Sequence, residues 1–173
     1  MRSWGSYIND VTWHLIPATR FFALKRRMLQ WAGAEIGHNV RLTSSARVAL
    51  GGRLIIGDNS WIGHQVLFVG GDAEVQIGSD CDVAPRVSFI TGTHEIEIEG
   101  VKAAGKGYSL PITIGSGCWI CASATILGGT VIGDHSIVAA GAVVKGDFPP
   151  YSVIVGVPAR MLRSLRDSQM PAP

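Results

Sequence analysis

The sequence has few charged residues, few cysteines and no long apolar run, and each shortage excludes a class of protein. Hydrophobic residues make up 47% of the 173 residues and charged residues 16%, yet no uninterrupted apolar run approaches the roughly 20 residues of a transmembrane helix. A net charge of +2 is too small to indicate nucleic-acid binding. The N-terminus lacks the charged-then-apolar order of a signal peptide, so we expect a cytoplasmic protein.

The three cysteines, Cys81, Cys118 and Cys121, are too few to build a disulfide framework. Cys118 and Cys121 have CxxC spacing, but a single such pair is weak evidence for a metal or redox site. We therefore expect reduced thiols and no bound metal ion.

What the sequence does contain is a repeat of six residues. An aliphatic or aromatic residue recurs at every sixth position, and glycine often follows it, as in "IGHN", "IGDN" and "IGSD". The period is strict from Ile114 to Val144. A period of six fits neither a lone helix nor a hairpin sheet. It is typical of an all-β hexapeptide β-helix, in which three short strands form one triangular coil of about 18 residues.

Stacked coils place residues about 18 positions apart above one another, which predicts three inward-facing columns. The columns are Ile36, Ile56, Ile77, Ile114 and Ile132; Leu42, Ile62, Val83, Ile120 and Val138; and Val48, Phe68, Phe89, Ile126 and Val144. We interpret two small slips in this register as turn insertions.

The corner positions of the coils support the same assignment. Four residues after each anchor the side chain is small, as in Cys118, Ala124, Thr130, Ser136 and Ala142. Cys81 has the same phase, so we expect Cys81 and Cys118 to be packing residues. The turns carry residues that tolerate positive φ, namely Asn39, Asn59, Asp80 and Gly117.

The repeat divides the chain into three parts. Residues 1–33 lack it, and their apolar spacing predicts one or two helical segments that cap the open end of the β-helix. Residues 34–158 form the β-helix domain, which a non-repetitive excursion at 94–111 interrupts. Residues 159–173 predict a short helix from about Ala159 and a tail.

The N-terminal part also carries a basic cluster of Arg20, Lys25, Arg26 and Arg27 among aromatic residues. This pattern predicts a docked amphipathic helix whose basic face is solvated. A weak contact with a membrane surface, or with an acidic partner, is the alternative interpretation.

Among the five histidines, His94 has an unusual position. His38, His64 and His135 occupy turn positions, and His14 belongs to the N-terminal part, whereas His94 lies at the entrance of the excursion. An excursion of this length in a compact repeat is usually functional. His94 is therefore either a catalytic base or a residue that anchors the loop by a hydrogen bond.

The segments "TGTHE" and "GYSLPITIGSGCWICASATILGGTVIGDHSIVAAGAVVKGDFPPYSVIVGVPAR" resemble the hexapeptide-repeat acyltransferases. Among these, the chain is similar over residues 34–163 to the sugar O-acetyltransferases of the galactoside and maltose type and to their exopolysaccharide-biosynthesis relatives. The resemblance implies a left-handed parallel β-helix, a homotrimer with active sites between subunits, and acetyl-CoA as co-substrate. It also implies that His94 acts as general base in a direct transfer to a sugar hydroxyl.

The resemblance assigns further site residues. The positions that match coenzyme contacts in the family are Ala122, Ala140, Lys145, Gly146, Arg160 and Arg163. On the acceptor side, Asp72 matches a sugar-contacting acid, and His64 stands where the family has asparagine. Cys121 stands where the family usually has glycine. The departure at His64 leaves the identity of the acceptor open.

Several alternatives remain at this stage. The acceptor of the resembling enzymes is a small-molecule or lipid-linked sugar, which indicates surface polysaccharide biosynthesis, but an amino sugar or an antibiotic is also compatible. A non-catalytic β-helix scaffold would have no reason to keep the histidine-bearing excursion together with "GVPAR". A γ-type carbonic anhydrase needs a pair of zinc-binding histidines about five residues apart, and the sequence has no such pair.

Overall fold

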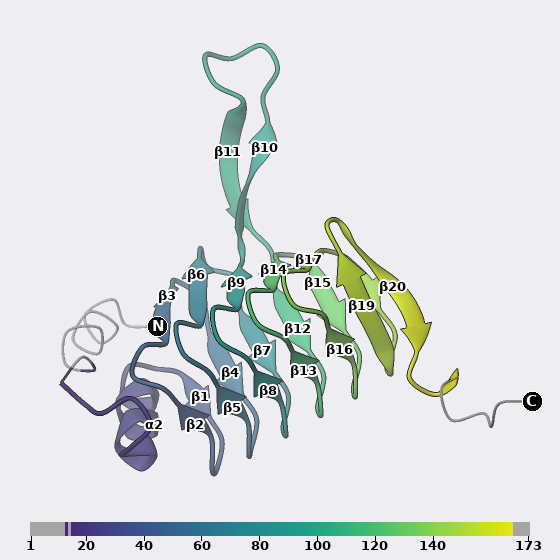
Figure 1. The fold of residues 1–173 in the computed structure, drawn as a ribbon. Helices are drawn as coiled ribbons and strands as arrows, with labels where there is room; N and C mark the ends of the chain where they lie inside the picture. Colours follow the sequence, from purple (N-terminus) through teal and green to yellow (C-terminus); the bar gives the residue numbers. More distant parts are fainter. Residues whose placement is uncertain (1–12, 14, 168–173) are drawn as a thin grey trace, which may run out of the picture.

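The computed structural model describes residue 13 and residues 15–167. Figure 1 shows a solenoid of short strands with helix α2 (Phe22–Trp31) at one end and a two-stranded arm projecting from its middle. The predicted helical segments within residues 1–12, and the predicted tail within residues 168–173, lie outside the described residues. No helix in the described part of the chain is both long and apolar enough to cross a membrane.

Three sheets form the faces of the solenoid. The first sheet contains β1 (Glu35–Ile36), β4 (Leu54–Ile56), β7 (Val75–Ile77), β12 (Ile112–Ile114), β15 (Thr130–Ile132) and β18 (Asp147–Phe148). The second contains β2 (Arg41–Leu42), β5 (Trp61–Ile62), β8 (Asp82–Val83), β13 (Trp119–Ile120), β16 (Ile137–Val138), β19 (Ser152–Gly156) and β20 (Ala159–Ser164). The third contains β3 (Arg47–Leu50), β6 (Leu67–Gly70), β9 (Ser88–Ile90), β14 (Thr125–Leu127) and β17 (Val143–Val144).

Parallel pairing between successive coils confirms the predicted fold class and its register. In the second sheet, Ile120 pairs with Val83 on one side and with Val138 on the other. The other two columns pair in the same way, and Phe68 stacks on Phe89 with ring centroids 4.9 Å apart. Burying each aliphatic anchor contributes about 1.5–3 kcal/mol relative to leaving it exposed. The columns therefore supply a large part of the apolar stabilisation of the solenoid.

The predicted corners are also confirmed. The turn residues Asn39, Asn59, Asp80 and Gly117 all have φ between 55° and 68°. Asn39 donates to the amide oxygen of Asn59, and Asn59 donates to Asp80, so the corner forms a hydrogen-bonded ladder. The small corner residues are buried, and the thiol of Cys81 donates to the carbonyl oxygen of Gly115 at 3.1 Å.

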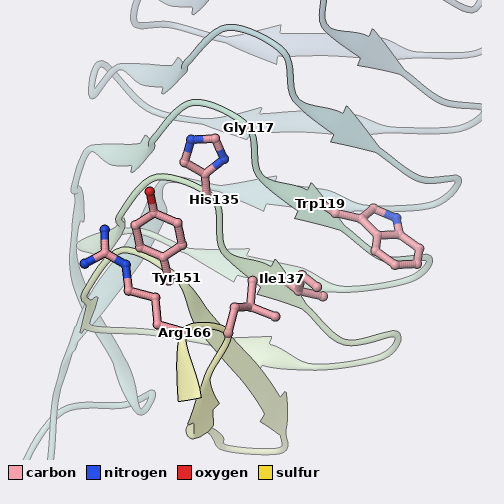
Figure 2. A pocket seen from close by; sticks show the side chains of 7 residues that line it. Gly117, Trp119, His135, Ile137, Tyr151 and Arg166 are labelled. Carbon is pink, nitrogen blue, oxygen red and sulfur yellow. The ribbon is translucent and has the colours of Figure 1, made fainter. Parts of the chain in front are cut away.

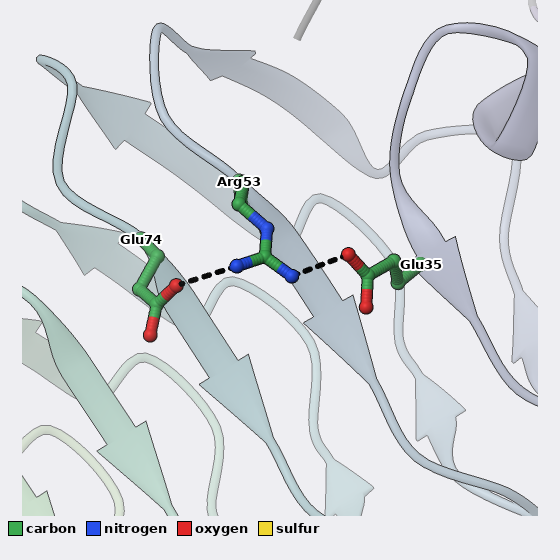
Figure 3. A network of polar contacts seen from close by, with 3 residues as sticks. All are labelled: Glu35, Arg53 and Glu74. Carbon is green, nitrogen blue, oxygen red and sulfur yellow. Dashed lines mark hydrogen bonds and ion pairs between the residues drawn. The ribbon is translucent and has the colours of Figure 1, made fainter.

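The outer face of the first sheet carries an ion-pair row. Arg53 contacts Glu35 of the preceding coil and Glu74 of the following coil (Figure 3). Because these side chains are exposed, solvent screening leaves each pair only a small contribution to stability. The row connects three coils but does not define the fold.

The structure corrects the prediction for the C-terminal part. The helix expected from Ala159 is wrong, because residues 159–164 form β20 and pair antiparallel with β19. Helix propensity favoured the expected helix, but β19 would otherwise be an open strand edge with unpaired backbone groups. Pairing with β20 satisfies those groups and closes this end of the second sheet.

Candidate active site

The excursion is a hairpin arm made of β10 (Gly92–Ile96) and β11 (Ala104–Ser109). It leaves the solenoid where the chain passes from the third sheet to the first, and we call this corner the arm edge (turns 71–74, 91–111 and 145–146). His94 lies on β10 opposite Gly107, and its side chain is exposed. A Cβ atom at Gly107 would lie 3.5 Å from Nε2 of His94, so the glycine leaves this side of the imidazole uncovered. Within the described residues the ring of His94 makes no hydrogen bond.

Asp72 lies on the same edge, against the base of the arm. The neighbouring Ala73 N–H donates to Ser109 Oγ at 3.1 Å, which fixes this turn to β11. A Cβ atom at Gly92 would lie 3.6 Å from the Cα atom of Gly70, so the backbones approach closely here. The structure therefore brings Asp72 and His94 to one edge, in successive coils.

Ala122, Ala140 and His64 lie on a different corner, where the chain passes from the second sheet to the third. We call this corner the alanine edge (turns 63–66, 84–87, 121–124 and 139–142). The turns of Ala122 and Ala140 are stacked, because Gly141 N–H donates to the Ala122 carbonyl oxygen at 3.0 Å. His64 lies two coils earlier, with its Nδ1 atom 3.1 Å from Ser45 Oγ.

The remaining assigned residues lie towards the C-terminal end. Lys145 and Gly146 form the turn between β17 and β18 on the arm edge, and Gly146 has a φ of 114°. Arg160 and Arg163 lie on β20, opposite Val155 and Val153. Both arginine side chains are exposed.

One subunit does not bring these groups into one site. The third sheet separates the two edges, and its strand β14 is three residues long, which corresponds to about 10 Å of extended chain. His94 lies on β10 of the projecting arm. Within one subunit, His94 and the alanine pair therefore lie on separate edges.

Comparisons with known proteins show what the repeat and the fold are similar to. The sequence model described as bacterial transferase hexapeptide (six repeats) matches residues 111–146. The chain is 34% identical to the galactoside O-acetyltransferase of Escherichia coli over 78% of its own length and 65% of that enzyme. It is 28% identical to an E. coli protein named for acetyl transfer in colanic acid biosynthesis, over 92% of the chain and 88% of that protein.

A solved structure extends the likeness to almost the whole chain. A hexapeptide-repeat acetyltransferase of Vibrio cholerae, complexed with acetyl coenzyme A, superposes with a TM-score of 0.73 and 26% identity. The match covers 95% of the chain and 86% of that protein. The chain is a hexapeptide-repeat protein that is similar in sequence and fold to these acetyltransferases. Its matches to the first curated relatives span 65% and 59% of their length, so its activity is argued separately below.

In this hexapeptide-repeat protein the structure also groups residues that the sequence analysis did not assign to a binding site (Figure 2). They line a pocket of about 570 Å³ on the corner between the first and second sheets: Gly117, Trp119, His135, Ile137, Tyr151, Leu165 and Arg166. His135 and Tyr151 stack with centroids 5.2 Å apart, and the Arg166 guanidinium lies 4.0 Å from the Tyr151 ring centroid. The 18-residue spacing of Gly117 and His135 was a signal for this column, but nothing in the repeat pointed to Arg166.

Cys81 and Cys121 are poor nucleophiles in this chain. The neighbouring Cys118 thiol and burial together raise the pKa of Cys81. Burial also raises the pKa of the half-buried Cys121 thiol. A raised pKa lowers the fraction of reactive thiolate at neutral pH. Within the described residues, no group of three or more His, Cys, Asp or Glu side chains is placed to hold a metal ion.

Proposed function

We propose that the chain is an acetyl-CoA-dependent O-acetyltransferase that acts as a homotrimer on a sugar hydroxyl. The observation that supports this proposal most directly is that the candidate site residues lie on two different edges of the solenoid. His94 and Asp72 lie on the arm edge, while Ala122 and Ala140 lie on the alanine edge. A cyclic trimer of parallel prisms would bring the arm edge of one subunit to the alanine edge of the next.

The chemistry of such a site is direct transfer. His94 takes the proton of the acceptor hydroxyl as that oxygen attacks the thioester carbonyl carbon, and the tetrahedral intermediate expels the CoA thiolate. The proton held by His94 then neutralises the leaving thiolate. An imidazole can act as a base at neutral pH, and backbone N–H groups can stabilise the oxyanion. Both substrates are bound together, so no acyl-enzyme forms.

The coenzyme side of the proposal is supported by the C-terminal strands. The exposed arginines Arg160 and Arg163 provide charge for the nucleotide phosphates, and arginine suits phosphate by its planar, multidentate donors. Trp119 and Arg163 lie in one row across the second sheet, joined through Ile137 and Val153. The Vibrio cholerae relative was crystallised with acetyl coenzyme A, which is the co-substrate that we propose here.

The acceptor side is less constrained. Asp72 at the base of the arm is our candidate for a sugar contact, and His64 replaces the asparagine of the resembling enzymes. Relatives named for galactoside and colanic acid acetylation support a sugar hydroxyl in surface polysaccharide biosynthesis. Acetyl-CoA turnover against free sugars, nucleotide sugars and lipid-linked oligosaccharides, with amino sugars as the competing class, identifies the acceptor.

A mixed-trimer experiment tests the shared site. Subunits with His94→Ala keep the alanine edge, and subunits with Ala122→Trp keep the base but block the coenzyme path. Each homotrimer should be inactive, whereas trimers co-assembled from equal amounts should regain about one quarter of the wild-type rate, because one interface in four combines two intact edges. Inactive mixed trimers would show that each site belongs to a single subunit.

A further inference from the structure

The N-terminal end of the solenoid carries large apolar side chains that are exposed among the residues that the structure describes. They belong to α2 and the segment before it: Leu15 (85% exposed), Phe21 (63%), Leu24 (49%) and Trp31 (62%). A helix that only caps a β-helix would be expected to expose polar residues on its outer side. This surface therefore needs another explanation, and we call it the cap surface.

The two opposite sides of α2 differ, because one packs on the solenoid and the other is exposed. On the inner side, Leu29 and Lys25 are buried, and Phe22 packs edge-on against Trp61 at 6.1 Å between centroids. Leu24 and Trp31 are seven residues apart, so they lie on one face of the helix, and the exposed Arg27 lies between them. The helix is thus docked by one side and presents an apolar and basic side outward.

The charge around the cap surface is of one sign. The side chains of Arg20 and Arg27 are exposed, and residues 11–34 contain no aspartate or glutamate. The first acidic residue after this segment, Glu35, is already paired with Arg53. Within the described residues, neither arginine forms an ion pair with a carboxylate.

A pocket on the flank of α2 adds two more cations. It has a volume of about 440 Å³ and is lined by Phe22, Arg26, Asn39, Arg41 and Asn59. Arg26 donates to the Val40 carbonyl oxygen at 3.4 Å, and Arg41 lies 5.2 Å from the Trp61 ring centroid. Within the described residues neither guanidinium is in an ion pair with a carboxylate, so both remain available to a phosphate group.

We propose that the cap surface binds an anionic lipid bilayer. Leucine and aromatic side chains bordered by arginine are typical of helices that lie in the membrane interface, where the apolar side enters the acyl boundary and the cations contact headgroup phosphates. A second copy fits less well, because a symmetric contact would bring Arg20 and Arg27 of both copies together without an acidic partner. The inference is independent of the proposed acetyl transfer, and its test does not use activity.

Vesicle flotation of the full chain tests the proposal. We expect the protein to float with vesicles of phosphatidylcholine and phosphatidylglycerol at low salt, and to stay unbound with phosphatidylcholine alone. The double variant Leu24→Gln and Trp31→Gln should lower the apparent affinity at least about tenfold, since each side chain loses part of its apolar burial. Arg27→Gln should lower it about threefold to tenfold, and less at high salt because screening weakens the contact.

Matched variants elsewhere on the molecule serve as controls. Val131→Gln removes a side chain that is 46% exposed on the first sheet, and Arg86→Gln removes an exposed cation from a distant turn. Both should bind vesicles like the wild type. Equal binding by the double variant and the wild type would overturn the proposal, as would failure of the wild type to bind anionic vesicles. Light scattering that shows loss of self-association in the double variant, with vesicle binding unchanged, would assign the surface to a second copy instead.

Discussion

The solenoid and the arm differ in how they treat their apolar side chains: the solenoid buries them and the arm exposes them. In the solenoid the anchors are fully buried, as Val83 and Ile120 show, and each coil hydrogen-bonds to the next. In the arm, Ile96 and Ile98 are 87% and 88% exposed, and Val101 is fully exposed. An isolated two-stranded hairpin is at best marginally stable in water. The solenoid therefore buries its own anchors, whereas the arm leaves its apolar side chains exposed, which predicts that another surface covers them.

The largest effect should follow from removing the one imidazole on the arm. His94→Ala should lower kcat by about 10²–10⁴-fold, the usual range for the loss of a general base. Because His94 contacts no anchor of the solenoid, thermal stability, light scattering and coenzyme binding should stay at wild-type values. His38→Ala is the matched control, since His38 is exposed in a turn of the first coil. An active His94→Ala enzyme would refute the base assignment.

Two isoleucine substitutions, one in the solenoid and one in the arm, compare how much each region contributes to the free energy of unfolding. Ile120→Ala removes a fully buried anchor and should lower the free energy of unfolding by about 2–5 kcal/mol. Ile98→Ala removes an exposed side chain, so the unfolding free energy of the subunit should change by less than about 0.5 kcal/mol. Denaturant titrations of both variants measure the contrast.

The Ile98 variant then tests what the arm contacts. If a neighbouring subunit covers the arm, Ile98→Ala should shift light scattering towards monomer at low protein concentration. Similar unfolding losses in both variants, with no change in association, would mean that the arm is stabilised within its own subunit.

The contrast also explains what the sequence could predict. A residue such as Ile120 has a neighbour one coil away on each side, so its burial follows from a period that is visible along the chain. The slips before Ile56 and Ile77 do not disturb this pattern, because the extra residues lie in turns near Gly51 and Gly71. The hexads therefore specified columns, corners and fold class.

Features that depend on contacts between residues far apart in the sequence could not be predicted from the hexad period. Residues 159–164 have good helix formers, and only the open edge of β19 explains why they form a strand. The pocket residue Arg166 follows that strand, so its position beside Tyr151 depended on the part that was predicted wrongly. The division of His94 and Ala122 between two edges follows from the order of the sheets, but the projection of the arm required the structure.

A smaller effect should follow on β20, at the end of the solenoid. Arg160→Ala should weaken acetyl-CoA binding about 10- to 150-fold if its hydrogen bonds to phosphate are worth about 1.5–3 kcal/mol. The KM for the acceptor should stay almost unchanged, since the acceptor residues lie on other turns. Arg166→Ala is the matched control, because that guanidinium stacks on Tyr151. Initial rates with CoA thioesters with and without the 3′-phosphate measure the effect, and unchanged constants for both would contradict the assignment.

The smallest effect should come from the cysteines, which belong to the solenoid side of the comparison. Cys81 and Cys118 fill buried corners, and their thiols donate to the carbonyl oxygens of Gly115 and Gly133. Serine keeps the size and the donor, so Cys81→Ser and Cys118→Ser should cost little stability. Cys121→Gly removes only a half-buried thiol of raised pKa. The triple variant should therefore keep most of its turnover.

Kinetics and mass spectrometry decide between the two mechanisms that this comparison separates. Direct transfer from bound acetyl-CoA requires a ternary complex, so initial-rate plots should intersect, whereas an acetyl-cysteine intermediate would give parallel lines. Intact-protein mass spectra after incubation with acetyl-CoA alone should show no added acetyl group. A trapped acetyl group on a cysteine, lost together with activity in the triple variant, would assign the catalytic role to a cysteine of the solenoid instead of His94 on the arm.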